Sequence, residues 1–216
     1  MNATQQLTRS VLLVIDMEND FLPGGALAVP DGDAVIPVIN RVMPLFPLVV
    51  ATRDWHPPGH ISFASRHQGK EPGQTAEVDY GEQVMWPEHC VQATHGAMFP
   101  EELDQRPFNL ILHKGTRQDL DSYSAFFEND RTTSTGLEPY LAGMGVEKVF
   151  VCGLAEDVCV SFTAQDARRL GFETYLIENA TRGVDIPEGN LEEARQAMQE
   201  KGVKRVSSQQ VEEMAE

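Results

Sequence analysis

Strand-like apolar runs alternate with helix-like segments along this chain of 216 residues. The first run, VLLVIDM at Val11–Met17, is almost continuously hydrophobic, which is typical of a strand covered on both faces. The next segment, Asp33–Phe46, has apolar residues at helical spacing. A repeated order of strand and helix predicts a mostly parallel sheet with helices on both faces, which is a Rossmann-like three-layer α/β fold.

The same pattern predicts the positions of the remaining elements. The predicted strands are 11–17, 48–56, 110–116, 148–155, 174–182 and 203–208, and the predicted helices are 33–46, 136–146, 156–172 and 189–202, with a last helical turn in 208–216. The stretch 57–107 is rich in Gly, Pro, His and polar residues, so we expect it to be irregular. Neither a repeat nor a linker interrupts the pattern, and we expect one domain over residues 1–216.

Net charge limits the kinds of partner. The formal charge is −16, from 17 basic and 33 acidic residues. Nucleic acids and anionic membranes bind clustered Lys and Arg, so we expect neither as a partner and interpret the acidity as that of a soluble surface. A homo-oligomer is compatible with the sequence. The chain shows no apolar run near the roughly 20 residues of a membrane span and no secretory signal, which indicates a cytoplasmic protein.

Reactive side chains follow four of the predicted strands. Asp16 follows the first strand, Asp54 and His56 the second, Lys114 the third, and Cys159 comes a short turn after the fourth. Ligands of open parallel sheets bind outside the carboxyl ends of the strands. We therefore expect these five side chains at one edge of the sheet.

Cys159 is the candidate nucleophile among them. It lies in the first turn of the predicted helix 156–172, where unpaired N–H groups and the helix dipole favour a thiolate and can bind an oxyanion. The alternative is a buried structural cysteine, which is the commoner role. The other two cysteines, Cys90 and Cys152, are expected to pack in the interior, and an odd total of three without a CxxC pair argues against a disulfide framework.

Asp16 and Lys114 complete a possible triad with Cys159. The carboxylate can take the thiol proton, and the ammonium stabilises both anions, which is a way to activate a nucleophile without histidine. Taken singly, Asp16 could be a turn residue and Lys114 a surface lysine with a buried stem.

Asp54 and His56 also begin a pattern of metal ligands. They are two residues apart, so both point to one face at the strand end. His60 and His89 follow downstream. A carboxylate with two or three neutral imidazoles suits one divalent ion, with zinc as our first expectation and iron or manganese as alternatives. The remaining histidines, at 67, 95 and 113, are interpreted as loop or structural residues.

Five stretches together resemble a known family. VIDMENDF, DWHPPGHISF, MWPEHCV, KGTRQDLDSYSAF and VCGLAEDVCV are similar to the nicotinamidase (pyrazinamidase) members of the isochorismatase-like cysteine hydrolases, from about Val11 to Gly183. The GLAEDVCV motif with Asp16 and Lys114 marks the superfamily. DWH with WPEHC marks its metal-bearing branch.

The resemblance implies a role for each site residue. The triad would be Asp16, Lys114 and Cys159, and the metal ligands would be Asp54, His56 and His89, with His60 as a fourth ligand in some members. Phe21 and Trp86 match the aromatic positions that sandwich a pyridine ring, although ordinary core packing is their alternative role. A cis peptide would join Leu154 to Ala155, and the N–H groups of Ala155 and Cys159 would form the oxyanion hole. The implied enzyme is a metal-dependent cysteine amidohydrolase that cleaves the carboxamide C–N bond of nicotinamide, with pyrazinamide as a further candidate substrate, in the salvage of NAD.

Two features depart from the family pattern. The family usually has Gln at the position of Glu18, and we expect the Glu18 side chain to point away from Asp16. The insert Gln68–Met85 is long and is expected to shape or cover the pocket. Three alternatives stay open: an isochorismatase-type or other amide hydrolase, a metal-binding redox sensor that uses Cys159 as a reactive thiol, and an inactive interaction protein.

Overall fold

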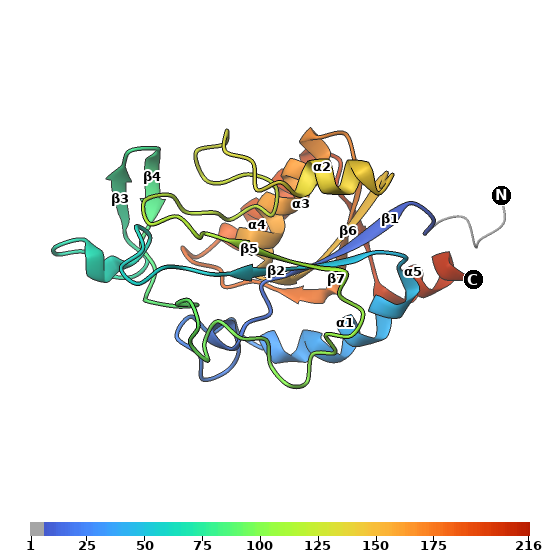
Figure 1. Ribbon diagram of the computed structural model, residues 1–216, viewed down its shortest axis with the longest axis horizontal. Helices are drawn as coiled ribbons and strands as arrows, with labels where there is room; N and C mark the ends of the chain where they lie inside the picture. Colours follow the sequence, from blue (N-terminus) through green and yellow to red (C-terminus); the bar gives the residue numbers. More distant parts are fainter. Residues whose placement is uncertain (1–6) are drawn as a thin grey trace.

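A six-stranded parallel sheet forms the centre of the molecule. The computed structural model describes residues 7–216. The strands are β1 (Ser10–Ile15), β2 (Val49–Asp54), β5 (Leu110–Lys114), β6 (Lys148–Leu154), β7 (Glu173–Arg182) and β8 (Lys204–Val206). They lie in the order β5-β2-β1-β6-β7-β8, and every pair in this sheet is parallel (Figure 1). The predicted α/β fold is therefore confirmed.

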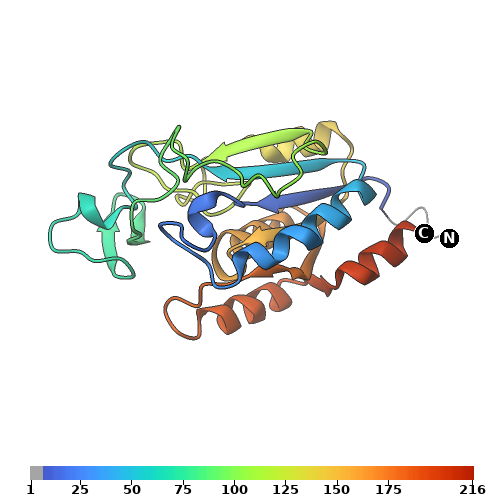
Figure 2. The same ribbon diagram turned by 90° about the horizontal axis from the view of Figure 1, so that it is seen from below.

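Helices cover both faces of the sheet. On one face lie α1 (Ile36–Val42) and α5 (Ser208–Ala215), and on the other lie α2 (Leu137–Gly143), α3 (Ser161–Arg169) and α4 (Asn190–Glu200) (Figures 1 and 2). Alternate residues of β1 pack into two separate hydrophobic clusters: Leu12 and Val14 into one, Val11, Leu13 and Ile15 into the other. The unbroken apolar sequence of this strand is thus explained by burial on two sides.

The helix boundaries differ locally from the prediction. The predicted helix 33–46 is α-helical only in its middle part, α1. A 3₁₀ turn precedes α1 at Gly32–Val35, and another follows it at Met43–Leu45. One proline lies near the start of α1 and another in the 3₁₀ turn Met43–Leu45. The predicted helix 156–172 begins as a π-helical turn, Glu156–Val160, and continues as α3. This wider turn contains Cys159, so an irregular helix start lies at the candidate nucleophile.

A hairpin lies inside the stretch that was predicted to be irregular. The antiparallel strands β3 (Thr75–Val78) and β4 (Gly81–Val84) project from the edge of the molecule at which the candidate site lies (Figure 1). The prediction was wrong for these residues, because the two short strands are mostly polar and are held by their own ladder of hydrogen bonds, so no hydrophobic alternation marks them. Within residues 7–216, the structure has no helix long and apolar enough to cross a bilayer.

Candidate active site

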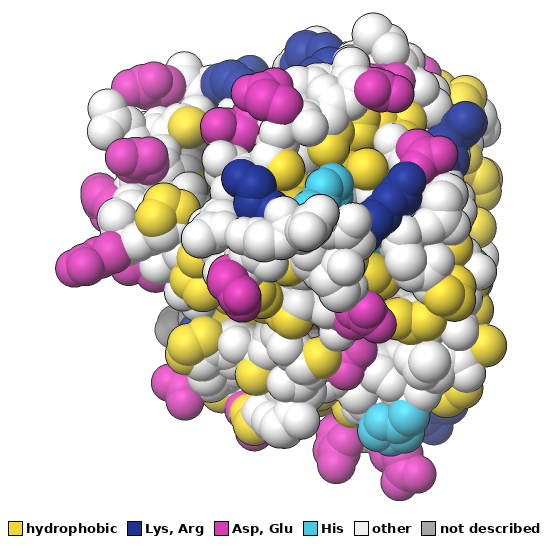
Figure 3. Space-filling view, turned by 90° about the vertical axis from the view of Figure 1, so that its left-hand side faces the viewer, with side chains coloured by type: hydrophobic (Ala, Val, Ile, Leu, Met, Phe, Trp, Pro, Cys, Tyr) yellow, Lys and Arg dark blue, Asp and Glu magenta, His cyan; other side chains and the backbone are white. Residues whose placement is uncertain are grey.

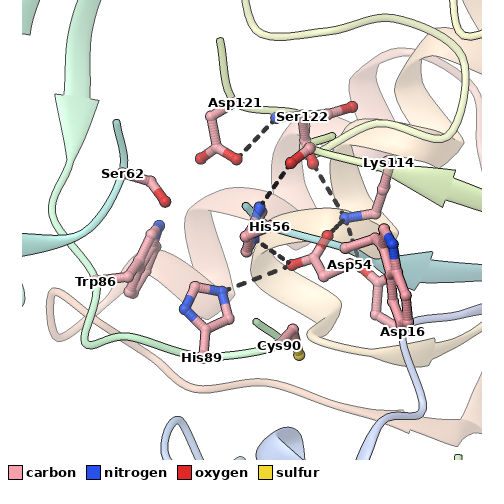
Figure 4. A network of polar contacts seen from close by, with 12 residues as sticks. Asp16, Asp54, His56, Ser62, Trp86, His89, Cys90, Lys114, Asp121 and Ser122 are labelled. Carbon is pink, nitrogen blue, oxygen red and sulfur yellow. Dashed lines mark hydrogen bonds and ion pairs between the residues drawn. The ribbon is translucent and has the colours of Figure 1, made fainter. Parts of the chain in front are cut away.

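The strand order brings the predicted side chains together. The chain adds β2 and β5 on one side of β1, and it adds β7 and β8 on the other side of β6. The order in which strands are added to the sheet therefore reverses between β1 and β6, and ligands of such sheets bind at this point. Asp16 follows β1 and Cys159 follows β6, while Asp54 and Lys114 end the neighbouring strands β2 and β5. Figure 4 shows Asp16, Asp54, His56 and Lys114 turned toward one another at this edge.

Lys114 lies at the centre of the cluster. Its ammonium nitrogen is 2.7 Å from Asp16 Oδ2, contacts Asp54 Oδ1, and donates to Cys159 Sγ at 3.5 Å and to the Ser122 carbonyl at 3.0 Å. The lysine and both carboxylates are almost completely buried. A buried ammonium with two carboxylates is an ion cluster rather than a surface lysine, which excludes the alternative role of Lys114.

The environment sets the protonation of the triad. Burial raises the pKa of Asp16 to about 6, although Lys114 opposes the change. Burial also raises the pKa of the Cys159 thiol well above its usual range, and Lys114 offsets this only in part. Burial and the adjacent Asp16 and Asp54 carboxylates thus oppose the thiolate that a helix start would favour. Asp16 is placed to act as the base that the thiol needs.

Backbone geometry holds the cysteine turn against β1. Gly153, the penultimate residue of β6, has φ +104°, and a Cβ at this position would lie 2.1 Å from the Ile15 carbonyl oxygen. Only glycine allows β6 to pass this close to the end of β1. The peptide bond that follows the last residue of β6, Leu154–Ala155, is cis, which confirms the expectation from the resemblance.

Three metal-ligand side chains converge next to the triad. One atom each of Asp54, His56 and His89 lies within 4.8 Å of the others. Asp54 Oδ2 is 3.3 Å from His56 Nε2 and 3.6 Å from His89 Nε2. His56 follows β2, and His89 comes from the long connection, so the tertiary fold brings the set together (Figure 4).

The second nitrogen of each imidazole is already occupied. His56 Nδ1 donates to the Gly115 carbonyl at 3.0 Å, and His89 Nδ1 donates to the Pro87 carbonyl at 2.8 Å. When both rings are neutral, the Nε2 atoms of His56 and His89 carry lone pairs that face Asp54 Oδ2. Three electron-pair donors then face one another, and a cation between them relieves the repulsion. The donor set therefore fits a divalent metal ion. Without one, the pKa of His56 lies above its ordinary value despite burial, because Asp54 stabilises the imidazolium.

His60 stands beside this group rather than within it. Its ring stacks on His56 with centroids 4.2 Å apart, and its nitrogens contact Ser62 Oγ at 2.8 Å and the Leu120 carbonyl at 3.4 Å. Burial lowers the pKa of His60 to about 4, which keeps the ring neutral. A ligand atom of His60 lies near His56 and Asp121 instead of near Asp54.

Glu18 points into the site, contrary to expectation. The side chain is fully buried, and its Oε1 accepts a hydrogen bond from the Asp54 backbone N–H. Burial, with Asp16 and Asp54 nearby, raises its pKa well above the usual range. The expectation was wrong because strand alternation places residues two apart on the same face, not on opposite faces. In addition, β1 has already ended at Ile15, and Asp16 has a left-handed backbone with φ +46°.

A cavity opens onto both groups. It is lined by Phe21, Leu27, Val29, Asp54, His56, Trp86, His89, Asp121, Tyr123, Ala155, Val158, Cys159 and Val184. Phe21 meets His89 edge-on at 5.5 Å between ring centroids, and the Trp86 indole N–H donates to the Tyr123 hydroxyl at 3.1 Å. Figure 3, which views this end of the molecule, shows hydrophobic side chains and a histidine between basic side chains, with acidic residues spread around them.

Sequence reasoning missed several of these lining residues. Asp121 and Tyr123 lie in the DSYSAF part of a stretch that carried the family resemblance, but nothing in the pattern assigned them a role. Leu27, Val158 and Val184 carry no chemical signal at all. The remaining cysteines behave as predicted, because Cys90 and Cys152 are buried free thiols.

Fold and site together define a class of α/β protein in which a buried Asp–Lys–Cys cluster adjoins a candidate metal centre. The family description "Isochorismatase domain" matches residues 10–210. The chain is 46% identical over 207 residues to a nicotinamidase of Acinetobacter baylyi, which covers 96% of each chain.

Solved structures agree with this relationship. A nicotinamidase–pyrazinamidase structure from Acinetobacter baumanii superposes with a TM-score of 0.93 at 50% identity, covering 96% of this chain and 100% of the other. A pyrazinamidase of Pyrococcus horikoshii in complex with zinc superposes with a TM-score of 0.72 at 39% identity, covering 92% and 99%. The chain belongs to the isochorismatase domain family and, within it, to the group of nicotinamidases and pyrazinamidases.

Proposed function

We propose that the protein hydrolyses nicotinamide to nicotinate and ammonia, with Cys159 as the nucleophile and Asp16 and Lys114 as its partners. One observation carries the proposal: the Cys159 thiol lines a cavity together with three candidate metal ligands, and behind it lie a buried ammonium and a carboxylate whose pKa burial raises to about 6. Relatives named nicotinamidase that match over nearly the whole chain support this substrate. Pyrazinamide is the second substrate that we propose, and the role is the return of nicotinamide to NAD synthesis.

The cavity suits a small flat amide. Phe21 and Trp86 lie on its wall and offer aromatic surfaces to a pyridine ring. The residues that would hold a divalent ion, with zinc as the first choice, are Asp54, His56 and His89. Such an ion would supply a Lewis acid for the ring nitrogen and so help to orient the substrate.

Acylation begins with transfer of the Cys159 thiol proton to Asp16. The sulfur forms a bond to the amide carbon, and the carbonyl oxygen becomes an oxyanion that the N–H groups of Ala155 and Cys159 stabilise. Asp16 then gives its proton to the departing nitrogen, the C–N bond breaks, and ammonia leaves a thioester on Cys159. Lys114 stays protonated throughout, because Asp16 and Asp54 raise its pKa against the effect of burial.

Deacylation uses the same residues in the same order. Asp16 takes a proton from water, the hydroxide oxygen adds to the thioester carbon, and the C–S bond breaks. Asp16 returns the proton to the cysteine sulfur, which restores the starting state and releases nicotinic acid, and this acid ionises to nicotinate in water.

Ammonia release from nicotinamide by the purified protein tests the proposal. The same sample is assayed before and after removal of metal by a chelator, and its metal content is determined. We expect activity that falls with the metal and returns with zinc, iron or manganese. A fully metal-loaded sample that is inactive on nicotinamide and on pyrazinamide would refute the substrate assignment.

Replacement of the nucleophile tests the covalent route separately. Cys159→Ala is expected to lower kcat by a factor of about 10⁴ or more while zinc content stays unchanged, because Sγ is not among the Asp54–His56–His89 ligands. Cys152→Ala is the matched control, since this thiol is buried in the core away from the cavity lining. Turnover near the wild-type rate in Cys159→Ala would rule out a thioester on this residue.

A further inference from the structure

One buried side chain connects the β3–β4 hairpin to the cavity wall. Gln83, on β4, is only 1% exposed, although most of the hairpin is polar and open to solvent. Gln83 does not line the cavity itself, but three residues that do, Trp86, Asp121 and Tyr123, belong to the hydrogen-bond network around it.

The amide nitrogen of Gln83 reaches two of these wall residues. Nε2 carries two hydrogens, which it shares among three acceptors: Asp121 Oδ2 at 2.9 Å, the Tyr123 hydroxyl oxygen at 2.8 Å and the Val84 carbonyl at 2.8 Å. A carboxylate and a carbonyl both require a donor. The nitrogen must therefore lie on this side of the amide group.

The amide oxygen of Gln83 is held from the opposite side. Oε1 accepts from the Tyr80 hydroxyl at 3.0 Å and from Asn129 Nδ2 at 3.1 Å. Asn129 Oδ1 in turn accepts from the Tyr123 backbone N–H at 3.0 Å. Every hydrogen-bonding group of the Gln83 amide thus has a partner, which gives the side chain a single orientation.

The Tyr123 hydroxyl is constrained by this arrangement. Its oxygen accepts from Trp86 Nε1 at 3.1 Å and faces the shared hydrogens of Gln83 Nε2 at 2.8 Å, so N–H groups lie on the lone-pair side of the hydroxyl. Burial raises the pKa of Tyr123 well above its usual range, so the hydroxyl keeps its proton. Among residues 7–216 the structure shows no acceptor for that proton, and the side chain borders the cavity.

We propose that Gln83 is a positioning residue for substrate binding: it orients the Tyr123 hydroxyl and fixes the Asp121 carboxylate, so that the cavity wall presents a hydrogen-bond donor and a rigid Trp86 ring to a heteroaromatic amide. The proposal rests on the proposed amide hydrolysis. In this proposal the hairpin of the Gln68–Met85 insert supports the wall of the cavity and does not cover its opening.

Steady-state kinetics of four variants test the role in binding. Gln83→Leu removes both hydrogen-bonding groups and leaves a slightly shorter apolar side chain, Tyr123→Phe removes the hydroxyl, and the third variant combines the two. Glu82→Gln is the matched control, because Glu82 is exposed on the same strand. We expect Gln83→Leu to raise KM for nicotinamide about tenfold or more with kcat within about threefold of wild type, and Glu82→Gln to change neither.

The double variant distinguishes positioning from simple structural support. If Gln83 acts through Tyr123, the double variant is no worse in kcat/KM than the worse single variant. Multiplicative losses would overturn the proposal, as would an unchanged KM in Gln83→Leu. A loss in kcat alone that follows the fraction of unfolded protein would also overturn it.

A spectroscopic measurement separates this proposal from the proposed function. The chain has two tryptophans, so two indole N–H signals are expected in a ¹⁵N NMR spectrum, and Trp86→Phe assigns them. The Trp86 signal should shift in Gln83→Leu and Tyr123→Phe but not in Glu82→Gln. An unshifted Trp86 signal in an active enzyme overturns the proposed role of Gln83. A shifted Trp86 signal in a protein that is inactive on both amides overturns only the proposed function.

Discussion

At the scale of single residues, Lys114 balances charges that burial would otherwise make unfavourable. It is fully enclosed with Asp16 and Asp54, and its ammonium also contacts the Cys159 sulfur. Removal of one member of a buried ion cluster leaves charges without compensation, which costs more than the loss of an exposed pair.

We therefore expect Lys114→Met to lower the free energy of unfolding by about 3–5 kcal/mol. The matched control is Lys204→Met, which breaks the exposed pair with Glu173 and should cost about 0–1 kcal/mol. Urea denaturation of both variants provides the comparison. Equal losses in the two variants would show that the buried cluster contributes no special stability.

Glu128 provides a pH-dependent prediction away from the metal ligands. It is 7% exposed, and burial raises its pKa to about 7 from the ordinary 4.5, although Arg117 at 3.6 Å opposes the change. The folded state binds this proton more tightly than the unfolded chain. Its contribution to stability is therefore complete below pH 4.5 and is lost as the pH rises through about 7.

Glu128→Gln cannot ionise, so it should gain stability relative to wild type as the pH rises. We expect a gain of about 1–2 kcal/mol between pH 4.5 and pH 8, because solvent and Arg117 screen part of the shift. Free energies of unfolding at a series of pH values measure the difference. A difference that does not vary with pH would contradict the assignment.

At the scale of elements, the π-helical turn Glu156–Val160 anchors the segment after β7. Asp157 accepts hydrogen bonds from the N–H groups of Val184 and Asp185 at 2.9 and 2.8 Å and from Asn190 Nδ2 at 3.0 Å. Glu156 forms a two-bond ion pair with Arg195 of α4. Asp157 thus holds the wall segment that contains Val184, and Glu156 joins the turn to α4.

Asp157→Ala should loosen this wall. Each unpaired buried N–H costs about 1–3 kcal/mol, so hydrogen exchange of the Val184 and Asp185 amides should become about 10–100 times faster. Glu156→Gln is the control, because it leaves the Asp157 bonds in place. Unchanged exchange at both amides in Asp157→Ala would mean that other contacts hold the segment.

At the scale of the whole molecule, a metal ion would connect the sheet to the long segment between β2 and β5. Asp54 and His56 stand at the end of β2, while His89 belongs to that segment and is fixed by its bond to the Pro87 carbonyl. Binding that occurs only in the folded state adds stability in proportion to the logarithm of ligand concentration over Kd.

Metal removal should therefore lower Tm by about 10 °C, which corresponds to about 4 kcal/mol for an ion held at roughly a thousand times its Kd. Zinc should restore the original value. His89→Ala should show neither the loss nor the recovery. A chelated sample that metal analysis shows to be empty, yet with the Tm of the loaded protein, would contradict a structural contribution of the metal.

The sequence by itself determined most of the arrangement of strands and helices, because strands buried on two faces are continuously apolar and most connections between parallel strands are helical. It also indicated the triad and the metal ligands, because reactive residues at strand ends and five family-like stretches mark them. It could not show the β3–β4 hairpin or the role of Gln83, since short polar strands leave no hydrophobic period.

Only the tertiary structure decided the chemistry of the site. Glu18 lies inside the site, where its Oε1 accepts from the Asp54 backbone N–H, and burial raises the pKa of the Cys159 thiol. The single orientation of Tyr123 depends on partners 37 and 40 residues away along the chain. Such properties arise from the summed effect of neighbours that the chain brings together only on folding, so no local pattern encodes them.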